Sequence, residues 1–140
     1  MIQNDVTDNA SDGHVDYQLF ATNPIATRDL YFEARKGTEV PVLKTGDWTL
    51  LWQYDGNLVL YGPGYPYGAW NSNTSNKGDY LIFAGDGNLI IYGPGYPYGA
   101  WNSGTADSAH NGKGGRKLVL TPQGSLYITD QDGKAIWQAH

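Results

Sequence analysis

The chain has 140 residues, a length expected of one domain with a hydrophobic core of ordinary size. Its net charge of −5 argues against nucleic acid and anionic membranes as partners, because phosphate binding requires a basic surface. The sequence contains no cysteine, which excludes disulfides and thiolate metal sites, and no motif in it predicts a metal or a cofactor. Many glycines and aromatic residues and few charges favour short strands joined by tight turns.

The N-terminal residues carry none of the marks of a signal peptide, because residues 1–6 include neither a basic residue nor an apolar run. No apolar stretch approaches the length needed to cross a membrane, so membrane insertion is not expected. Unless the chain is a processed form, we expect it in the cytoplasm or released by a non-classical route.

Residues 1–16 hold four aspartates and no lysine or arginine, so they carry nearly all of the net charge. Two interpretations stay open: a solvated, flexible acidic arm, or a strand added to a neighbouring sheet. The folded domain is expected over residues 17–140. His14 in the arm and His110 in a loop at 104–116 are most simply surface residues.

Residues 17–20 and 30–34 alternate apolar and polar side chains, as strands do. Turn signals at Lys36-Gly37 and Thr45-Gly46-Asp47 bound a further strand at 40–43. No stretch of the sequence shows a sustained helical period with caps. The prediction is therefore an all-β fold.

A near-copy of residues 56–72 returns at 87–103, 31 residues later, with only two residues changed. A third and more divergent copy starts at Gly124 and ends on Trp137. Repetition at a fixed period indicates one supersecondary unit that is stacked more than once. We therefore expect three units around a shared core.

Each unit is expected to contain a hairpin, and the loop length decides which side chains share a face. A three-residue loop at 55–57 puts the apolar residues Trp52, Leu58 and Leu60 on one face. The predicted pairs are Tyr54 with Leu58, Gln53 with Val59 and Trp52 with Leu60 in the first unit, Phe83 with Ile91 and Ala84 with Ile90 in the second, and Leu120 with Ile128 and Thr121 with Tyr127 in the third.

Each unit ends in a strand that carries a tryptophan at an equivalent position, namely Trp70, Trp101 and Trp137. Three equivalent side chains meet where three units share an axis. We expect the three indoles to be buried near a pseudo-threefold axis, where each would contribute a large apolar area to the core.

The outward face of the first hairpin combines amides, a carboxylate, a phenol and an apolar spot, supplied by Gln53, Asp55, Asn57, Val59 and Tyr61. These groups offer donors and acceptors around an apolar patch. A sugar ring has the complementary pattern, with hydroxyls at its rim and a patch of C–H groups. The group contains no nucleophile held by a base, so the sequence favours binding over catalysis.

Residues 53–61, Gln-Tyr-Asp-Gly-Asn-Leu-Val-Leu-Tyr, resemble the Gln-x-Asp-x-Asn-x-Val-x-Tyr signature of the bulb-type mannose-binding lectins, first found in monocot plants. The resemblance covers residues 40–138 and leaves the first part of the chain unexplained. It implies a β-prism II fold, with three four-stranded antiparallel sheets around a pseudo-threefold axis. It also implies a non-enzymatic, multivalent lectin that binds mannose or mannose-containing glycans.

The resemblance assigns roles within the first site. Asp55 and Asn57 are expected to bind the axial 2-hydroxyl of mannose, Gln53 the 3-hydroxyl and Tyr61 the 4-hydroxyl. Val59 is expected to pack on the ring carbons.

The two other units depart from the signature. The second matches it at Asp86, Asn88, Ile90 and Tyr92, but Ala84 stands where glutamine is expected, which predicts a weaker site. The third matches it nowhere, so this site is expected to be lost. Its five equivalent positions are Thr121, Gln123, Ser125, Tyr127 and Thr129.

The loops at 62–68 and 93–99 are longer than the family usually has. Their tyrosine rings either stack on a second sugar and extend each site or cover the ends of the prism, and the sequence leaves both open. These rings are Tyr65, Tyr67, Tyr96 and Tyr98. The family also usually carries a disulfide in its first unit, which this sequence lacks.

Two other functions remain as alternatives. The same prism could bind a protein or act as a toxin-like or bacteriocin-like module with little dependence on sugar. A glycosidase would need two carboxylates about 5–10 Å apart, and Asp55 and Asp86 belong to different predicted sheets. The oligomeric state is also open, because family dimers commonly exchange the C-terminal strand while this chain stops three residues after Trp137.

Overall fold

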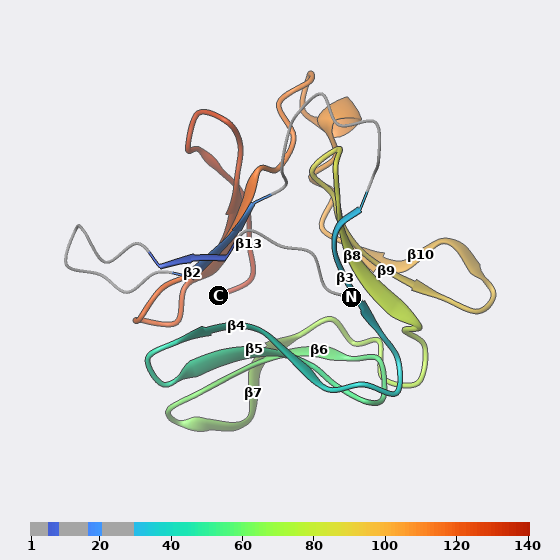
Figure 1. Cartoon of the computed structure of the whole chain (residues 1–140), viewed down its shortest axis with the longest axis vertical. Helices are drawn as coiled ribbons and strands as arrows, with labels where there is room; N and C mark the ends of the chain where they lie inside the picture. The colour runs from blue at the N-terminus through green and yellow to red at the C-terminus, as the bar shows by residue number, and fades with distance from the viewer. Residues whose placement is uncertain (1–5, 9–16, 21–29) are drawn as a thin grey trace.

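The computed structural model describes residues 6–8, 17–20 and 30–140. In this part of the chain, antiparallel strands form three sheets that stand as the sides of a triangular prism (Figure 1). None of the described residues lies in a helix long and apolar enough to cross a membrane. The all-β prediction is confirmed, and the only helical element described is a single 3₁₀ turn, η2 (Asp107–Ala109).

Sheet I is built from four strands that follow one another in the chain. They are β4 (Val40–Thr45), β5 (Trp48–Trp52), β6 (Leu58–Gly62) and β7 (Tyr65–Asn71). Sheet II has the order β10-β9-β8-β3. Its strands are β3 (Leu30–Arg35), β8 (Tyr80–Ala84), β9 (Leu89–Gly93) and β10 (Tyr96–Asn102).

Sheet III has five strands in the order β1-β2-β11-β12-β13, where four were predicted. They are β1 (Val6–Asp8), β2 (Tyr17–Phe20), β11 (Lys117–Leu120), β12 (Leu126–Thr129) and β13 (Ala135–Gln138). The fifth strand is β1, which pairs with β2 at the edge of the sheet. The rest of the predicted acidic arm lies outside the described residues.

The N-terminal part of the chain completes two of the sheets. Strand β3 pairs with β8, and β2 pairs with β11, so each repeat unit after the first takes its fourth strand from an N-terminal segment. This gives residues 17–20 and 30–35 a place in the prism, although the lectin resemblance does not cover them.

The hairpin registers differ from the prediction by two residues in every unit. Trp52 pairs with Leu58, and the equivalent pairs of the other units follow the same rule. The predicted pairs Tyr54–Leu58, Gln53–Val59, Trp52–Leu60, Phe83–Ile91, Ala84–Ile90, Leu120–Ile128 and Thr121–Tyr127 are therefore wrong.

The physical reason is the position of glycine in the loop. The loop spans residues 54–56, where the N–H of Gly56 donates to the carbonyl of Gln53 at 3.0 Å and the N–H of Gln53 donates to the carbonyl of Asn57 at 3.0 Å. Gly56 has φ +82°, the left-handed conformation that closes such a loop and that glycine adopts without strain. The predicted loop at 55–57 includes Asn57 and leaves out Tyr54. A shift of two residues preserves the faces, so the predicted inner and outer sides are still correct.

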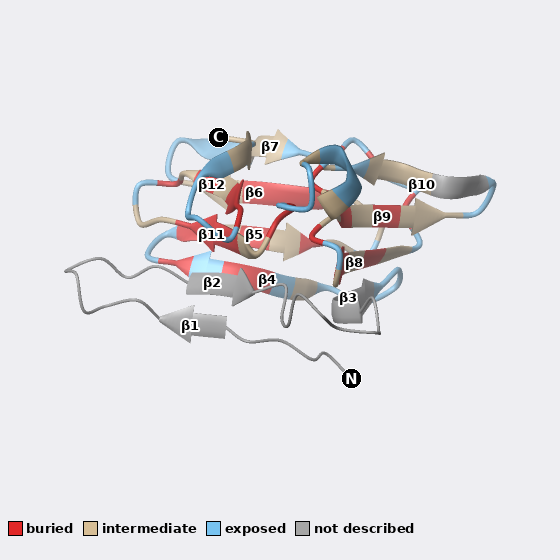
Figure 2. Cartoon of the chain, turned by 90° about the horizontal axis from the view of Figure 1, so that it is seen from above, coloured by how far each residue is buried: buried red, intermediate tan, exposed pale blue. Residues whose placement is uncertain are grey.

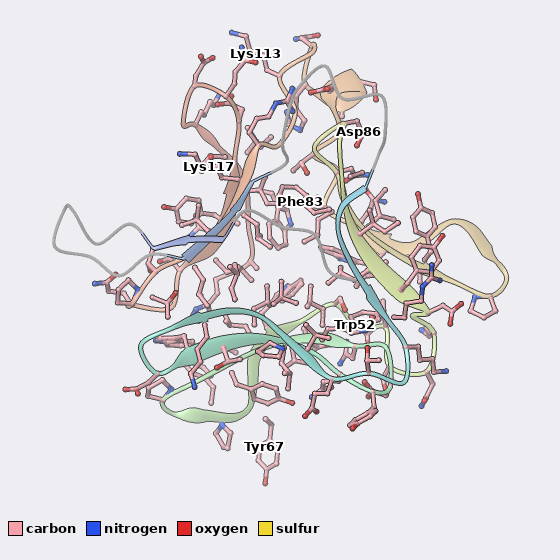
Figure 3. All side chains as sticks on the ribbon, in the orientation of Figure 1. Trp52, Tyr67, Phe83, Asp86, Lys113 and Lys117 are labelled. Carbon is pink, nitrogen blue, oxygen red and sulfur yellow. The ribbon has the colours of Figure 1, made fainter. Side chains whose placement is uncertain are left out.

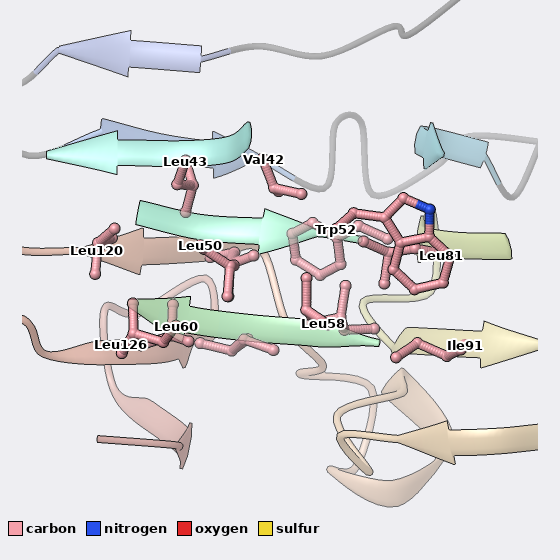
Figure 4. Close-up of a cluster of buried hydrophobic side chains, with 14 of the residues drawn as sticks. Val42, Leu43, Leu50, Trp52, Leu58, Leu60, Leu81, Ile91, Leu120 and Leu126 are labelled. Atoms are coloured by element: carbon pink, nitrogen blue, oxygen red, sulfur yellow. The ribbon is translucent and has the colours of Figure 1, made fainter. Parts of the chain in front are cut away.

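The core is assembled from equivalent positions of the three units (Figures 2 and 4). Each set contributes one side chain per sheet, and no member is more than 1% exposed. The sets are Trp52, Phe83 and Leu120; Leu58, Leu89 and Leu126; Leu60, Ile91 and Ile128; and Leu50, Leu81 and Leu118. Burial of this apolar surface is the main stabilising term for the prism.

The tryptophans that end the three units meet as predicted. The ring centroids are 5.6 Å apart for Trp70–Trp101, 5.6 Å for Trp70–Trp137 and 5.7 Å for Trp101–Trp137. Interplanar angles of 64° to 78° make every contact edge-to-face, an arrangement that aromatic quadrupoles favour. The three indoles are half-buried rather than fully buried, so they close one end of the core.

Candidate functional site

The first candidate site lies on the outer face of sheet I, because Trp52 and Leu58 point into the core (Figure 4). The structure brings four predicted polar residues of this site into two bonded pairs. The Gln53 side-chain amide donates to the Tyr61 hydroxyl, and the Asn57 N–H donates to Asp55 Oδ1 at 3.0 Å. Amide, carboxylate and phenol groups are therefore held together on one outer face.

The apolar member of the site is less accessible than expected. Val59 is only 3% exposed, and a Cβ added at Gly68 of β7 would lie 2.7 Å from Val59 Cγ1. The β7 backbone therefore passes directly against this side chain and leaves little apolar surface for a ligand. Its counterpart Ile90 is half-buried, although Gly99 approaches it in the same way.

Asn57 is oriented by residues that the signature does not contain. Its Oδ1 accepts hydrogen bonds from Ser72 Oγ and from the Thr74 N–H, both at 3.1 Å. Thr74 Oγ1 donates to the carbonyl of Gly56 at 2.7 Å, which ties the segment after β7 to the hairpin loop. The NH₂ group of Asn57 donates to Asn71 Oδ1 at 3.5 Å, a long bond. With Oδ1 engaged on both sides, the second N–H of this group is the donor that remains for a ligand.

The carboxylate of Asp55 is held in a similar way. Oδ1 caps the Asn57 N–H, and Oδ2 accepts a hydrogen bond from Ser75 Oγ at 2.7 Å. The backbone N–H of Asn76 donates to the Asp55 carbonyl at 2.6 Å. The segment 72–76 is thus a support for both signature residues of the loop, and sequence reasoning missed it. Its signal is the repeat of Trp-Asn-Ser-x-Thr at 70–74 and 101–105.

The second candidate site repeats this scaffold in sheet II. The Asn88 N–H donates to Asp86 Oδ1 at 3.1 Å, and Asn88 Oδ1 accepts from Ser103 Oγ and the Thr105 N–H, both at 3.2 Å. Asp86 lies at the hairpin loop of this sheet (Figure 3). The loop packs on the next linker, because a Cβ at Gly87 would lie 2.4 Å from the backbone of Gly115.

Two substitutions distinguish the second site from the first. Ala84 replaces Gln53 and is 6% exposed, so the amide that bonds the site tyrosine has no counterpart here. Ala106 replaces Ser75, so Asp86 lacks the hydroxyl that holds Asp55. Asp86 is accordingly exposed, whereas Asp55 is half-buried.

The third unit has the same backbone but a different chemistry. The Thr121 N–H donates to the Ser125 carbonyl at 3.0 Å, which confirms that these two positions correspond to Gln53 and Asn57. The Ser125 N–H donates to Thr121 Oγ1 at 3.1 Å, and Ala139 stands where Ser72 orients the asparagine. Neither the carboxylate–amide pair nor its support is therefore present in this unit.

The tyrosines of the long loops have different surroundings. Tyr65 is 42% exposed and packs on Trp48 and His140, with ring centroids 5.9 and 5.5 Å away. Tyr67 is 94% exposed and projects away from the prism (Figure 3). Tyr96 and Tyr98 belong to β10, but their side chains lie outside the described residues. Tyr65 therefore covers an end of sheet I, while Tyr67 is available for contacts.

Among the described residues, no group of three or more histidine, aspartate or glutamate side chains is arranged to hold a metal ion. The polar groups of the two sites are instead suited to hydrogen bonding with a neutral, hydroxylated ligand.

In sequence and in fold, the chain is similar to known lectins. No protein-family model matches the chain. The chain is 38% identical over 97 residues to Mannose-specific lectin 1 of Colocasia esculenta, a match that covers 69% of this chain and 21% of that protein. It thus spans about a fifth of the length of that relative. The crystal structures of monomeric monocot mannose-binding lectins from Gastrodia elata superpose with a TM-score of 0.60 at 28% identity, covering 81% of this chain and 96% of theirs.

The chain belongs to the bulb-type lectin family. A second solved structure, a lectin from Allium sativum, superposes on this bulb-type lectin with a TM-score of 0.53 at 25% identity, covering 78% of this chain and 94% of that one. The predicted family and the β-prism II architecture are therefore confirmed, with a fifth strand in sheet III as the difference.

Proposed function

We propose that this bulb-type lectin binds mannose or mannose-containing glycans through the sites on sheets I and II. The observation that carries the proposal is the pair of loops in which an aspartate and an asparagine are fixed side by side and repeated 31 residues apart. A donor and an acceptor held next to each other match a sugar hydroxyl, which both donates and accepts. The lectin domain comprises residues 17–140 in this proposal.

Within the first site, Asp55 accepts from the axial 2-hydroxyl and the NH₂ group of Asn57 donates to it. Gln53 and Tyr61 bind the 3- and 4-hydroxyls. Because these two side chains already bond each other, a sugar exchanges one hydrogen bond for others, and the net gain per bond is only about 0.5–1.5 kcal/mol. Val59 contributes little area, since it is 3% exposed.

These terms lead to weak binding of a single sugar. A few hydrogen bonds and a small apolar contact give a Kd of roughly 1 mM. Useful affinity then requires both sites to engage one glycan-bearing surface, which raises the effective affinity by about 10²–10⁴. In the second site, Asp86, Asn88, Ile90 and Tyr92 take the corresponding roles.

The protein acts by binding alone in this proposal. Asp55 and Asp86 lie in different sheets, so they do not flank one glycosidic bond as a pair of catalytic carboxylates does. The related proteins described above are lectins, which agrees with a binding function.

Retention on mannose–agarose tests the proposal. We expect the protein to be retained and to be eluted by methyl α-mannoside, and to pass through galactose–agarose under the same conditions. The double variant Asn57→Ala/Asn88→Ala removes the donor of both sites and should pass through both columns, while Ser125→Ala in the third unit should be retained. Equal retention of the double variant would contradict sugar binding at these two sites. Failure of the unmodified protein to be retained on mannose–agarose would contradict the proposal and favour a prism that binds protein.

A further inference from the structure

The tyrosines of the two sites are held in place by different neighbours. In the first site, Tyr61 accepts a hydrogen bond from the Gln53 amide, and its partner on β5 across the strand pair is Thr49. In the second site, Ala84 takes the place of Gln53, and the residue paired with Tyr92 is Tyr80. The two positions that flank the site tyrosine have thus changed together between the units.

Tyr80 stacks on the ring of Tyr92. Their ring centroids are 5.2 Å apart and their planes are inclined by 27°, whereas Thr49 has no ring to offer at this position. An offset face-to-face contact between aromatic rings restricts both side chains to a narrow range of orientations. Stacking therefore supplies the restraint on Tyr92 that a hydrogen bond from glutamine supplies on Tyr61.

A third residue supports the stack from the far side. Arg35, Tyr80 and Tyr92 are cross-strand partners on β3, β8 and β9, and Arg35 Cζ lies 4.8 Å from the centroid of the Tyr80 ring. The Arg35 backbone is itself anchored, because its carbonyl accepts a hydrogen bond from Trp52 Nε1 at 3.0 Å. The row thus fixes Tyr80 between a cation and a second aromatic ring.

We propose that Tyr80 is the positioning residue of the second saccharide site. It takes over the role of the missing glutamine by keeping Tyr92 in the orientation that binds a sugar hydroxyl. This inference rests on the proposed mannose-binding function. Its consequence is that the second site is preorganised without an amide, so the loss of glutamine at position 84 does not by itself abolish binding. Tyr80 acts through Tyr92 and is not expected to contact the sugar.

The test exchanges the two arrangements within sheet II. Tyr80→Thr reproduces the threonine of the first site without its glutamine, Tyr80→Thr/Ala84→Gln reproduces both, and Tyr80→Phe keeps the ring. Methyl α-mannoside is titrated into each variant, and NMR signals of the Asn57 and Asn88 side-chain amides report on the two sites separately. Binding at the first site serves as the control for folding in every variant.

We expect Tyr80→Phe to keep the affinity of the second site within about twofold, and Tyr80→Thr to weaken it about three- to tenfold, while the first site is unchanged. Adding Ala84→Gln to Tyr80→Thr should recover most of the loss. A general weakening of sheet II would not be repaired by glutamine at position 84. Unchanged binding in Tyr80→Thr, or a loss that glutamine does not repair, overturns the inference.

A measurement without sugar separates this inference from the proposed function. The ring-proton signals of Tyr92 should move in Tyr80→Thr and stay near their original positions in Tyr80→Phe, because the ring current of the neighbour is lost only in the first variant. If the mannoside binds nowhere but these signals move, the proposed function fails and the positioning of Tyr92 by Tyr80 stands. If the signals do not move in Tyr80→Thr, the positioning role is wrong whatever the protein binds.

Discussion

The side-chain oxygen of Asn57 accepts a hydrogen bond from the backbone N–H of Thr74 at 3.1 Å, across a separation of 17 residues. The Asn88–Thr105 pair repeats this bond at 3.2 Å. The signature residue Asn57 is therefore oriented by the segment that follows β7 in the same unit. This relationship makes the linker between two units part of the site of the first one.

Replacing Thr74 by valine tests this support. Thr74 is 1% exposed, and its Oγ1 donates to the Gly56 carbonyl and lies 2.7 Å from Ser72 Oγ. Valine keeps the shape but leaves a buried carbonyl without its donor, which should lower the free energy of unfolding by about 1–3 kcal/mol. Chemical denaturation measures this loss, and NMR titration should show weaker sugar binding at the first site only. Ser75→Ala, at an exposed position, is the matched control for stability and should change it by less than about 0.5 kcal/mol.

The tryptophan cluster predicts a larger loss of stability. Trp70 contacts both Trp101 and Trp137 edge-to-face, so Trp70→Ala removes two aromatic contacts and opens the end of the core. We expect a loss of about 3–5 kcal/mol in the free energy of unfolding, measured by denaturation. Tyr67→Ala removes a ring that is 94% exposed and should change stability by less than about 0.5 kcal/mol. Equal effects of the two substitutions would mean that the cluster does not hold the sheets together.

The sequence predicts those features of the fold that depend on residues close together in the chain. The alternation of apolar residues settles the inner and outer faces, because a register error of two residues leaves both faces unchanged. The register itself is not settled by this alternation: the loop expected at 55–57 lies at 54–56, where Gly56 adopts the left-handed conformation. The repeat and the signature are likewise visible in the sequence, and they predict the family and the prism.

What the sequence did not predict depends on contacts between distant segments. The pairing of β2 with β11 and of β3 with β8 joins residues about 50–100 positions apart. The sequence of these short N-terminal strands does not indicate which strand they pair with or in which register. The burial of Val59 depends on the close approach of Gly68, which the letters of the signature cannot reveal. The hydrogen bonds from Ser72 and Thr74 to Asn57 also join distant segments, so the sequence does not predict them, although both residues recur in the second unit.

The edge strand predicts the effect of shortening the chain. Strand β1 has three residues and pairs with β2 alone, so a chain that begins at Tyr17 loses one short edge strand and keeps four strands in sheet III. We expect its melting temperature to fall by only a few degrees, because short edge strands contribute little to the stability of a sheet. Thermal unfolding followed by circular dichroism measures the difference. A much larger drop would show that residues before Tyr17 stabilise the prism substantially.

The exposed ring of Tyr67 predicts a difference between short and long ligands. The neighbouring Gly68 packs on Val59 of the first site, so Tyr67 is attached next to that site while its ring points away from the prism. Tyr67→Ala should therefore leave the binding of methyl α-mannoside unchanged but weaken the binding of a linear mannotriose about three- to tenfold, the effect of losing one ring contact. Calorimetric titration with both ligands measures this. Equal effects on both ligands would place the ring in the primary site, and no effect on either would leave Tyr67 without a role in binding.

The three sites should differ in their affinity for mannose, because their polar groups differ. The first site has the full set of polar groups, the second lacks the amide at Ala84, and the third has Ser125 where the first has Asn57. Asn57→Ala removes the donor of the site with the most hydrogen bonds, so it should reduce binding to a mannan-coated surface more than Asn88→Ala does. Each substitution leaves one working site, and the remaining binding should be weaker by about 10²–10⁴ because linked engagement of two sites is lost. Ser125→Ala should change binding by less than about twofold.

Surface plasmon resonance on immobilised mannan measures all three variants, with a galactan surface as the control. A loss of binding in Ser125→Ala together with full binding in Asn57→Ala would show that the sugar does not bind at the signature residues.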